Sequence, residues 1–256
     1  MSSNFPVDII VSKNVTACVI VIGNEILSGR TQDLNVAYIG KRCDEIGIRL
    51  MHTRIIPDLE ETIITTVNEC RMLFDYVFTS GGIGPTHDDI TSASIARAFN
   101  KELIRSAEAV ALLDNYYEAG KLTEARLKMA DVPQDSILID NPVSAAPGFQ
   151  LENVFVMAGV PVIMQAMFEA IVERLSGGEA MLMTSIATNL GESALASELS
   201  KIQDAFSDVS IGSYPFFKQG KLGVNLVMRC TDESRLALLQ KDIKLMIEKL
   251  GGEVID

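Results

Sequence analysis

The chain has 256 residues, of which 48% are hydrophobic and 8 are proline, and its formal net charge is −12. This length and composition allow one large α/β domain and a small second one, without long disordered segments. The negative charge argues against nucleic acid as a partner, because phosphate backbones require clustered Lys and Arg, and against an anionic membrane surface.

The sequence also lacks signals for membranes, secretion or disulfides. No apolar run reaches the ~18 residues of a spanning helix, and the first ten residues lack the basic and apolar regions of a signal peptide. Cys18, Cys43, Cys70 and Cys230 show no metal-type spacing. We therefore expect a cytoplasmic protein whose cysteines are reduced and buried.

The first part of the chain alternates short apolar runs with amphipathic segments. The apolar runs predict buried strands at 16–23, 50–56 and 75–80. The amphipathic segments predict helices at 33–47, 59–72 and 90–99. This alternation predicts right-handed crossovers and an α/β fold with a doubly wound, mostly parallel sheet.

The remaining elements predict a second, smaller module. Further helices are expected at 107–119, 123–129 and 162–175, and short strands at 137–139, 149–151 and 154–157. The segment Ser176-Gly177-Gly178 is the best linker candidate, so we place an α/β domain at 1–176 and an α+β module at 177–256. The β-α-β-β-α order of that module is typical of ferredoxin-like or KH-like folds. It has no basic GxxG loop, which disfavours RNA binding.

The segment Thr79–Thr91, TSGGIGPTHDDIT, follows a predicted strand and opens a predicted helix. In an α/β sheet such junctions lie at the carboxyl edge, where ligands bind. Gly81, Gly82 and Gly84 allow backbone amides to approach an anion, and the helix N-terminus favours negative charge. Asp88 and Asp89 are themselves anionic and no lysine lies in the loop. The pattern therefore predicts a phosphate cradle that works with a metal ion.

A purely structural alternative exists for this loop. The glycines would only form a tight turn, and Asp88 or Asp89 would cap the following helix. Two adjacent carboxylates repel each other, however, and a cap requires only one. The segment is not a P-loop, because the glycine spacing differs and the Lys-Ser/Thr pair is missing.

Other polar residues follow predicted strands. Glu25 emerges at the same edge and could join Asp88 and Asp89 around a hard divalent cation, although this motif alone favours an ordinary turn with a solvated glutamate. Asp33 serves as a helix N-cap in the simplest interpretation, next to Asn35. The small-residue loops 141–149 and 159–161 could wall a ligand pocket.

Neither histidine indicates acyl-transfer chemistry. His52 lies in a predicted strand and is expected to be structural. His87 could titrate near neutrality or contact a phosphate, or it could be a solvated loop residue. No Ser-His-Asp or cysteine nucleophile constellation is present.

Taken together and in order, five segments resemble the molybdopterin-binding fold shared by the MoaB/Mog proteins and the competence/damage-inducible protein CinA. They are Gly23–Gly29 (GNEILSG), Asp33–Asn35 (DLN), Gly81–Thr91, Asn141–Phe149 (NPVSAAPGF) and Ala158–Met164 (AGVPVIM). The resemblance is strong over residues 16–175 and is nearer to the CinA amino-terminal branch, which also occurs fused to FAD synthases. Leu34, Ser144, Ala158 and Ile163 depart from the family pattern, where threonine, glycine, proline and glutamate are usual.

The resemblance implies candidate roles for particular residues. The ligand or phosphate would be bound by Gly81, Gly82, Gly84, Pro85, Thr86, Asn35, Asn141, Pro147, Gly148, Gly159 and Pro161. Asp88 and Asp89 would be catalytic and, with Glu25, would bind a divalent metal ion of the Mg or Co type, with a monovalent cation as a second ion. A homo-oligomer, dimer or trimer, is also implied. The deamidase domain of full-length CinA proteins is expected to be absent.

Three functions are compatible with this resemblance. The CinA branch implies metal-dependent hydrolysis of ADP-ribose-like nucleotide pyrophosphates, and the MoaB/Mog branch implies molybdopterin binding in molybdenum cofactor biosynthesis. A catalytically silent binder is the third, favoured by the departures at Leu34 and Ile163. The second module and the complete GPT-x-DD loop favour the hydrolase, with a nucleotide or pterin phosphate as the small-molecule ligand.

Overall fold

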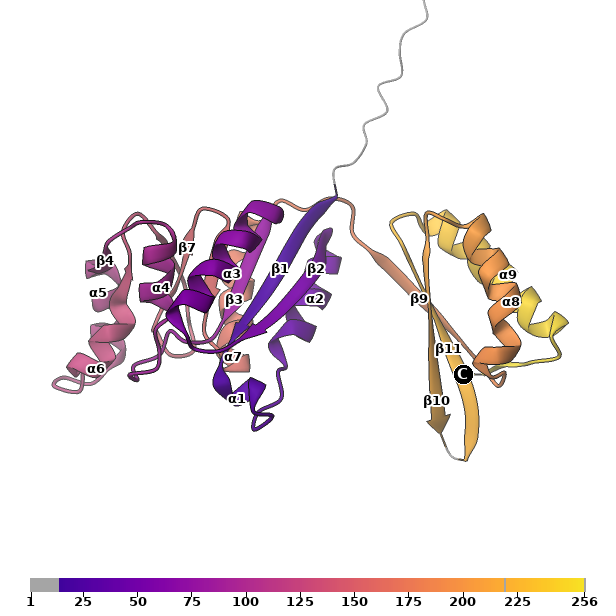
Figure 1. The fold of residues 1–256 in the computed structure, drawn as a ribbon, viewed down its shortest axis with the longest axis horizontal. Coiled ribbons are helices and arrows are strands. Elements are labelled where there is room, and N and C mark those ends of the chain that lie inside the picture. Colours follow the sequence, from indigo (N-terminus) through magenta and orange to yellow (C-terminus); the bar gives the residue numbers. More distant parts are fainter. Residues whose placement is uncertain (1–13, 219, 256) are drawn as a thin grey trace, which may run out of the picture. The chain divides into compact units, whose positions relative to one another are not determined.

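The structure is a computed structural model that describes residues 14–218 and 220–255. The first ten residues, considered above for a signal peptide, lie outside this part. The chain divides into two compact units between Gly178 and Glu179, close to the predicted linker (Figure 1). Within the described residues no helix is long and apolar enough to cross a membrane.

The larger unit is built on a six-stranded sheet in the order β2-β1-β3-β8-β7-β6. Its strands are β1 (Val15–Ile22), β2 (Ile48–Ile56), β3 (Tyr76–Ser80), β6 (Ile137–Ile139), β7 (Gly148–Leu151) and β8 (Val154–Met157). β2, β1, β3 and β8 are parallel, and β7 is antiparallel to both of its neighbours. The expected mostly parallel sheet is confirmed, with an antiparallel edge.

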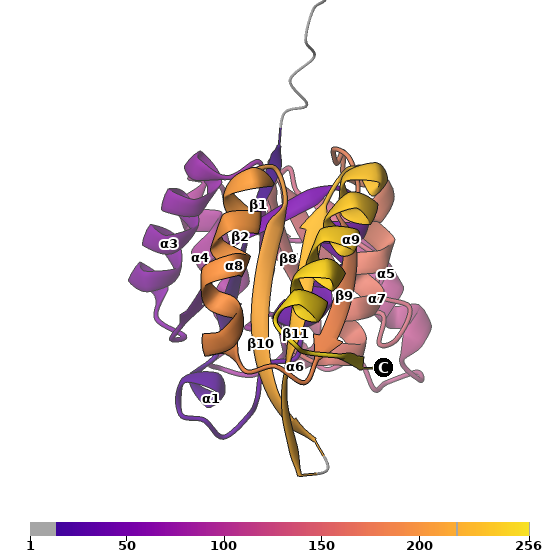
Figure 2. The ribbon, with the colours of Figure 1, turned by 90° about the vertical axis from the view of Figure 1, so that its right-hand side faces the viewer.

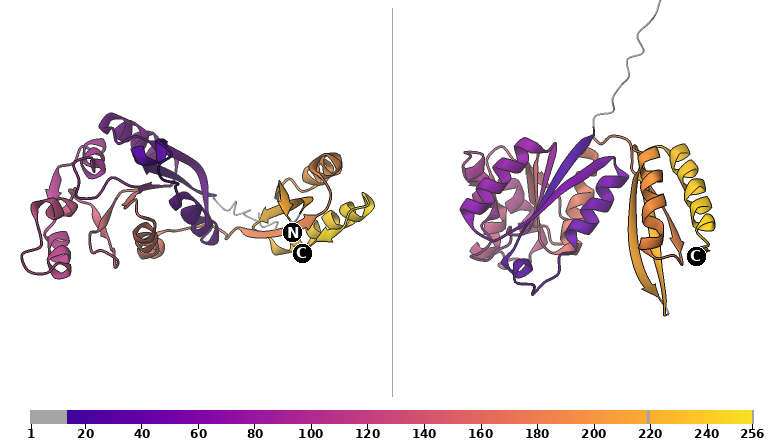
Figure 3. Two further views of the ribbon diagram at one scale, coloured as in Figure 1. Left: turned by 90° about the horizontal axis from the view of Figure 1, so that it is seen from below. Right: turned by 45° about the vertical axis from the view of Figure 1, so that its right-hand side comes forward.

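Helices cover both faces of this sheet because successive residues of a strand point to opposite sides. Val19 and Val21 pack with one pair of helices, α2 (Asn35–Glu45) and α7 (Pro161–Ile171). Cys18 and Ile20 pack with the other pair, α3 (Glu60–Leu73) and α4 (Thr91–Ala98). Figure 3 shows these helices on either side of the strands. β1 is therefore buried on both faces, as its continuous apolar run predicts.

The remaining elements of this unit are short. The connection after β1 contains α1 (Asn24–Leu27). The segment between α4 and β6 contains β4 (Leu103–Arg105), α5 (Ala107–Tyr116), α6 (Glu124–Leu127), η1 (Lys128–Ala130) and β5 (Asp131–Pro133), and η2 (Val172–Arg174) follows α7. The helices predicted at 107–119 and 123–129 are thus shorter than expected. α5 ends where Tyr117 becomes extended, and α6 tightens into a 3₁₀ turn before β5 begins.

The smaller unit has the expected β-α-β-β-α order followed by a short final strand. Its antiparallel sheet, in the order β10-β11-β9-β12, contains β9 (Leu182–Thr188), β10 (Ser210–Lys218), β11 (Lys221–Cys230) and β12 (Val254–Ile255). Both α8 (Glu192–Ala205) and α9 (Glu233–Lys249) lie on one face of that sheet (Figure 2). Leu195, Leu226 and Leu239 belong to the separate core beneath them. The four cysteines of the chain are free and buried, as expected.

The separate core of the smaller unit leads to a stability prediction. Leu239→Ala empties a fully buried position of α9 and should lower the free energy of unfolding of this unit by about 2–5 kcal/mol. Native-state hydrogen exchange should show the loss in α8, α9 and β9–β11. Leu238→Ala, at a neighbouring position that is 48% exposed, is the control and should change stability by less than about 0.5 kcal/mol. Equal loss of protection in β1 and β3 would contradict two separate cores.

Candidate ligand-binding site

A cavity of about 540 Å³ lies at the carboxyl edge of the parallel strands. β1 leads to β2 on one side, and β3 lies on the other side of β1. This arrangement makes β1/β3 a topological switch point, where α/β sheets open a crevice for ligands. The lining residues come from the segments that follow β1, β2, β3 and β8, from the loop before β7 and from η1. Many distant parts of the sequence therefore meet at one place.

The loop after β3 has no room for side chains at its three glycine positions. Gly81 has φ +111°, and a Cβ there would lie 2.2 Å from the Ile22 carbonyl oxygen. Gly82 has φ +71°, and its Cβ would lie 2.1 Å from Thr91 Oγ1. At Gly84 a Cβ would lie 2.6 Å from Asp89 Oδ2. The glycines thus allow β1, α4 and the loop's own carboxylate to approach the main chain closely.

The backbone amides of this loop differ in their availability. The Gly81 amide donates to the Met157 carbonyl at 3.0 Å, so it is not free for an anion, contrary to the expected role. The amides of Gly82 and Gly84 have no hydrogen-bond acceptor among the described residues, and both residues line the cavity. These two amides are therefore available to donate to a ligand, and their role as phosphate donors stays a prediction.

Thr86 organises the two aspartates. Its amide donates to Asp89 Oδ2 at 2.8 Å, and its hydroxyl lies 2.6 Å from Asp89 Oδ2 and 2.5 Å from Asp88 Oδ1. The hydroxyl carries one proton and therefore donates to one carboxylate at a time. α4 begins at Thr91, and its N-cap has no side-chain hydrogen bond. The alternative in which Asp88 or Asp89 caps this helix is therefore wrong.

The local contacts keep Asp88 ionised. The hydrogen bond from the Thr86 hydroxyl holds the pKa of the Asp88 carboxyl below its ordinary value, with smaller contributions from its own backbone amide and from the charges of His87 and Lys128. The His87 side chain is 97% exposed, with Nδ1 3.9 Å from Asp88 Oδ1. His87 is therefore a solvated loop residue in this structure, and His52 is exposed beside Phe74.

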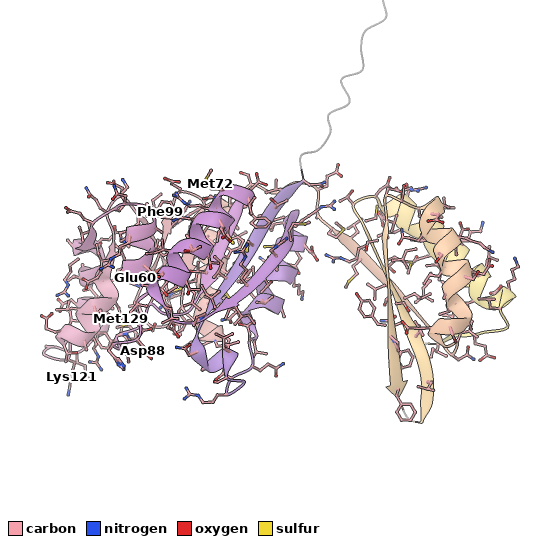
Figure 4. The ribbon with its side chains drawn as sticks, in the orientation of Figure 1. Glu60, Met72, Asp88, Phe99, Lys121 and Met129 are labelled. Atoms are coloured by element: carbon pink, nitrogen blue, oxygen red, sulfur yellow. The ribbon has the colours of Figure 1, made fainter. Side chains whose placement is uncertain are left out.

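A lysine reaches the loop from outside it. Lys128 belongs to η1, and its ammonium donates a hydrogen bond to the Thr86 carbonyl. The next residue, Met129, lines the cavity together with Asp88, and both are labelled in Figure 4. Sequence reasoning missed Lys128 because no local pattern connects it with a loop some forty positions earlier.

Glu25 and Asp58 bring two more carboxylates to the cavity wall. The Glu25 carboxylate folds over Gly23, where a Cβ would lie 2.6 Å from its oxygen. Asp58 accepts a hydrogen bond from the Asn24 amide at 2.9 Å, which ties α1 to the end of β2. Asp58 was not predicted, although it follows a parallel strand in the same way as Glu25.

The carboxylates share a cavity without forming a compact cluster. Within residues 14–218 and 220–255, no group of three or more His, Cys, Asp or Glu side chains lies close enough together to hold a metal ion. Glu25, Asp88 and Asp89 are therefore not gathered in advance around one position. Their assignment as metal ligands stays a prediction.

The two predicted asparagines support the walls. Asn35 is buried, and its Nδ2 donates to Ser80 Oγ at 2.7 Å and to the Gly159 carbonyl at 2.8 Å. Its Oδ1 has no partner in the described part of the chain. Asn141 lines the cavity, but its Oδ1 accepts from the Val143 amide at 3.1 Å. Its Nδ2 donates within the same loop, so the oxygen and the nitrogen of the side-chain amide are both already engaged. Asp33 Oδ1 accepts from the Val36 amide at 2.9 Å, but the N-cap position of α2 is Leu34, so Asp33 lies one residue before the expected position.

The other predicted residues divide into two groups. Gly159 and Pro161 line the cavity, as do Pro85 and the departing residues Ala158, Ile163 and Ser144. Thr86, Pro147 and Gly148 do not line it. Pro147 and Gly148 are buried at the start of β7, and a Cβ on Gly148 would lie 2.4 Å from the Val156 carbonyl oxygen. The missing side chain at Gly148 allows β7 to pair closely with β8, and neither residue lines the cavity.

Comparison with known proteins agrees with this geometry. Residues 18–177 match the family described as a probable molybdopterin binding domain. The chain belongs to this family. Residues 180–251 match a second family, described as the middle domain of FAD synthase.

Individual relatives support the same assignment. A protein of Archaeoglobus fulgidus is 37% identical over 222 residues, which cover 87% of this chain and 94% of that protein. A putative competence-damage inducible protein of Clostridium botulinum is 28% identical over 93% of this chain, which spans 60% of that protein's length. The crystal structure of the protein CinA from Thermoplasma acidophilum matches with 34% identity and a TM-score of 0.59, covering 63% of this chain and 98% of that one. This member of the molybdopterin-binding domain family is thus CinA-like.

The glycine loop gives a prediction with a matched control. Gly82→Ala places a methyl group against Thr91 Oγ1 at positive φ and should lower the free energy of unfolding by about 3 kcal/mol or more. Gly120→Ala keeps the same type of backbone strain, with φ +80° and no atom within 4 Å of the new Cβ. It should cost only about 1–2 kcal/mol. Urea unfolding compares the two; equal losses would show that the contact with Thr91 is unimportant.

The carboxylate at 88 gives a pH prediction. Thr86→Val removes the hydroxyl that lowers the pKa of Asp88, so this pKa should rise toward its ordinary value. In the unsubstituted protein, the stabilising contribution is present above the unfolded-state pKa and is lost as pH falls through the lower folded-state pKa. Carbon-13 NMR titration of the Asp88 carboxyl measures the shift. Thr65→Val on α3 is the control, and an unchanged Asp88 titration in Thr86→Val would contradict the assigned cause.

Proposed function

We propose that the cavity binds a nucleotide pyrophosphate of the ADP-ribose type and hydrolyses it with the help of a divalent metal ion. The observation that carries this proposal is the meeting of two unengaged loop amides, four carboxylates and an apolar wall in one cavity. Each of these three features suits a different portion of such a ligand.

The loop side of the cavity suits the phosphates. The amides of Gly82 and Gly84 are available to donate to phosphate oxygens. They would also stabilise the charge that develops on these oxygens as water attacks phosphorus. A fixed main chain does so without reorganisation, since the close contacts of Gly81 and Gly82 hold the loop in place.

The cavity also has an apolar part that suits a flat heterocycle. Met129, Val160 and Ile163 line it with apolar side chains. Ligand cavities of roughly 300–1,000 Å³ with a mostly apolar wall and few polar groups are typical of small-molecule sites. The hydrophobic residue at 163, where the family pattern has glutamate, makes this wall less polar.

The carboxylates of the cavity are the type of ligand that a hard divalent cation prefers. Glu25, Asp58, Asp88 and Asp89 offer carboxylate oxygens, which Mg²⁺ prefers. Mg²⁺ is commonly held by one or two protein carboxylates together with substrate phosphates. The absence of a compact three-carboxylate cluster among the described residues is therefore compatible with an ion of the Mg or Co type that binds together with the nucleotide. When bound, the ion would neutralise phosphate charge and increase the acidity of a water molecule.

The chain's own residues have distinct tasks in this reaction. Asp89 is fixed by the amide and hydroxyl of Thr86, and it would hold its carboxylate toward the ion. The lowered pKa of Asp88 makes its carboxylate a weaker proton acceptor, so it is better suited to binding a cation than to accepting a proton. Water attacks one phosphorus, the bridging P–O bond breaks, and ADP-ribose yields AMP and ribose 5-phosphate.

A second candidate is molybdopterin binding in molybdenum cofactor biosynthesis. The family description of residues 18–177 favours it, and the same amides and apolar wall would accommodate a pterin phosphate. A catalytically silent binder would use the same contacts without turnover.

Cleavage of ADP-ribose by metal-stripped protein, with Mg²⁺ or Co²⁺ added back, tests the proposal. Metal-dependent release of AMP is expected, and Asp89→Ala should reduce its rate by about a hundredfold or more. Asp114→Ala removes an exposed carboxylate of α5 outside the cavity and is the control. No AMP release, combined with thermal stabilisation by a pterin phosphate, would favour molybdopterin binding instead.

A further inference from the structure

The negative charge of the cavity disfavours an anionic ligand. Glu25, Asp58, Asp88 and Asp89 line it, and no Lys or Arg is among its lining residues in the described part of the chain. Both phosphates of a pyrophosphate diester are ionised at neutral pH. A single divalent ion would have to offset the phosphates as well as the carboxylates, so an additional positive charge near the loop would favour binding.

Lys128 is placed to supply this charge. Its half-buried side chain rises from η1, beside the cavity residue Met129, and its ammonium bonds the Thr86 carbonyl. An ammonium group has three donors, of which the carbonyl uses one. In residues 14–218 and 220–255, Lys128 forms no ion pair and no second hydrogen bond. Its field nevertheless reaches Asp88.

The neighbouring cations behave differently. Arg105 is paired with Asp131 at 2.9 Å and with Glu124 at 3.0 Å. The Arg126 guanidinium lies 4.1 Å from the centre of the Tyr117 ring. These two arginines stabilise the segment between α4 and β6. The Lys128 ammonium instead lies against a carbonyl of the glycine loop, where a stronger acceptor would replace its present partner.

We propose that Lys128 is a phosphate-binding residue of this cavity, which exchanges the Thr86 carbonyl for a phosphate oxygen of the ligand. Charge-assisted hydrogen bonds to phosphate are stronger than those to a neutral carbonyl, so the exchange is favourable. Lys128 thereby performs from outside the loop the task that a lysine within the loop performs in other phosphate sites. The inference rests on the proposed function only in requiring a ligand that carries phosphate.

The test compares three variants: Lys128→Met, Lys128→Arg and Lys121→Met. Lys121 is an exposed lysine in the turn before α6 (Figure 4) and serves as the matched control. Isothermal titration of a methylene-bridged, non-hydrolysable ADP-ribose analogue, at fixed Mg²⁺, measures binding without turnover. Lys128→Met should weaken binding by about ten- to a hundredfold and reduce its dependence on salt. Lys128→Arg should recover most of the affinity, and Lys121→Met should change little.

The affinity for a metal ion provides a second test, because it should not change if Lys128 had only a structural role. In the absence of nucleotide, Lys128→Met removes a repulsive positive charge near Asp88, so Mn²⁺ measured by electron paramagnetic resonance should bind about three- to tenfold more tightly. Thermal unfolding confirms that each variant is folded.

The outcomes separate this inference from the proposed hydrolysis. Analogue affinity that is equal in the unsubstituted protein and Lys128→Met, with AMP release intact, would overturn the role of Lys128 alone. Lys128-dependent binding without AMP release would overturn the hydrolase and leave the phosphate contact standing. A protein that binds neither the analogue nor pterin phosphate would overturn both.

Discussion

The Gly81 α-carbon lies against the end of β1, where a Cβ would stand 2.2 Å from the Ile22 carbonyl oxygen. Its amide is bonded to the Met157 carbonyl at the end of β8. This one residue therefore holds the ends of three parallel strands together, and Gly159 packs so closely against it that a Cβ on Gly159 would lie 3.3 Å from the Gly81 α-carbon. The direction of the glycine loop and the opening of the cavity both depend on this contact, because any side chain here would separate β1 from β3.

Electrostatics provides the second constraint. Four carboxylates line the cavity, yet the elements that carry them are held by polar contacts, such as the Asp58 bond to the Asn24 amide. Thr86 holds Asp89 and receives Lys128 at its carbonyl, so one residue connects an anion and a cation of the site. Under the proposed function, the four carboxylates would disfavour an anion alone and favour an anion that binds together with a cation.

Much of this organisation can be predicted from the sequence, but some residues of the cavity cannot. The apolar runs identify β1 and β3, and the residues after them identify Glu25 and the loop from Gly81 to Asp89, because parallel strands end at one edge. The same argument applies to Asp58 after β2 and could have found it. Lys128 could not be found in this way, since its place depends on how α6 and η1 pack over the loop.

Local chemistry alone does not show which residues of a loop are available to a ligand. Glycines were expected to offer amides, but whether an amide is free depends on which carbonyl lies opposite it, as Gly81 shows. Pro147 and Gly148 were expected at the ligand because they belong to a small-residue loop. The missing side chain of Gly148 instead serves the pairing of β7 with β8, a tertiary requirement that the sequence pattern does not distinguish from binding.

Part of the cavity wall is main chain, and this limits how ligand selectivity can change within the family. Where Gly81, Gly82 and Gly159 form the wall, only backbone faces the ligand, and substitutions there damage the fold before they alter selectivity. Met129, Ser144 and Ile163 contribute side chains to the same cavity. New ligand preferences in this fold should therefore evolve at these positions, while the glycines of the wall should stay unchanged.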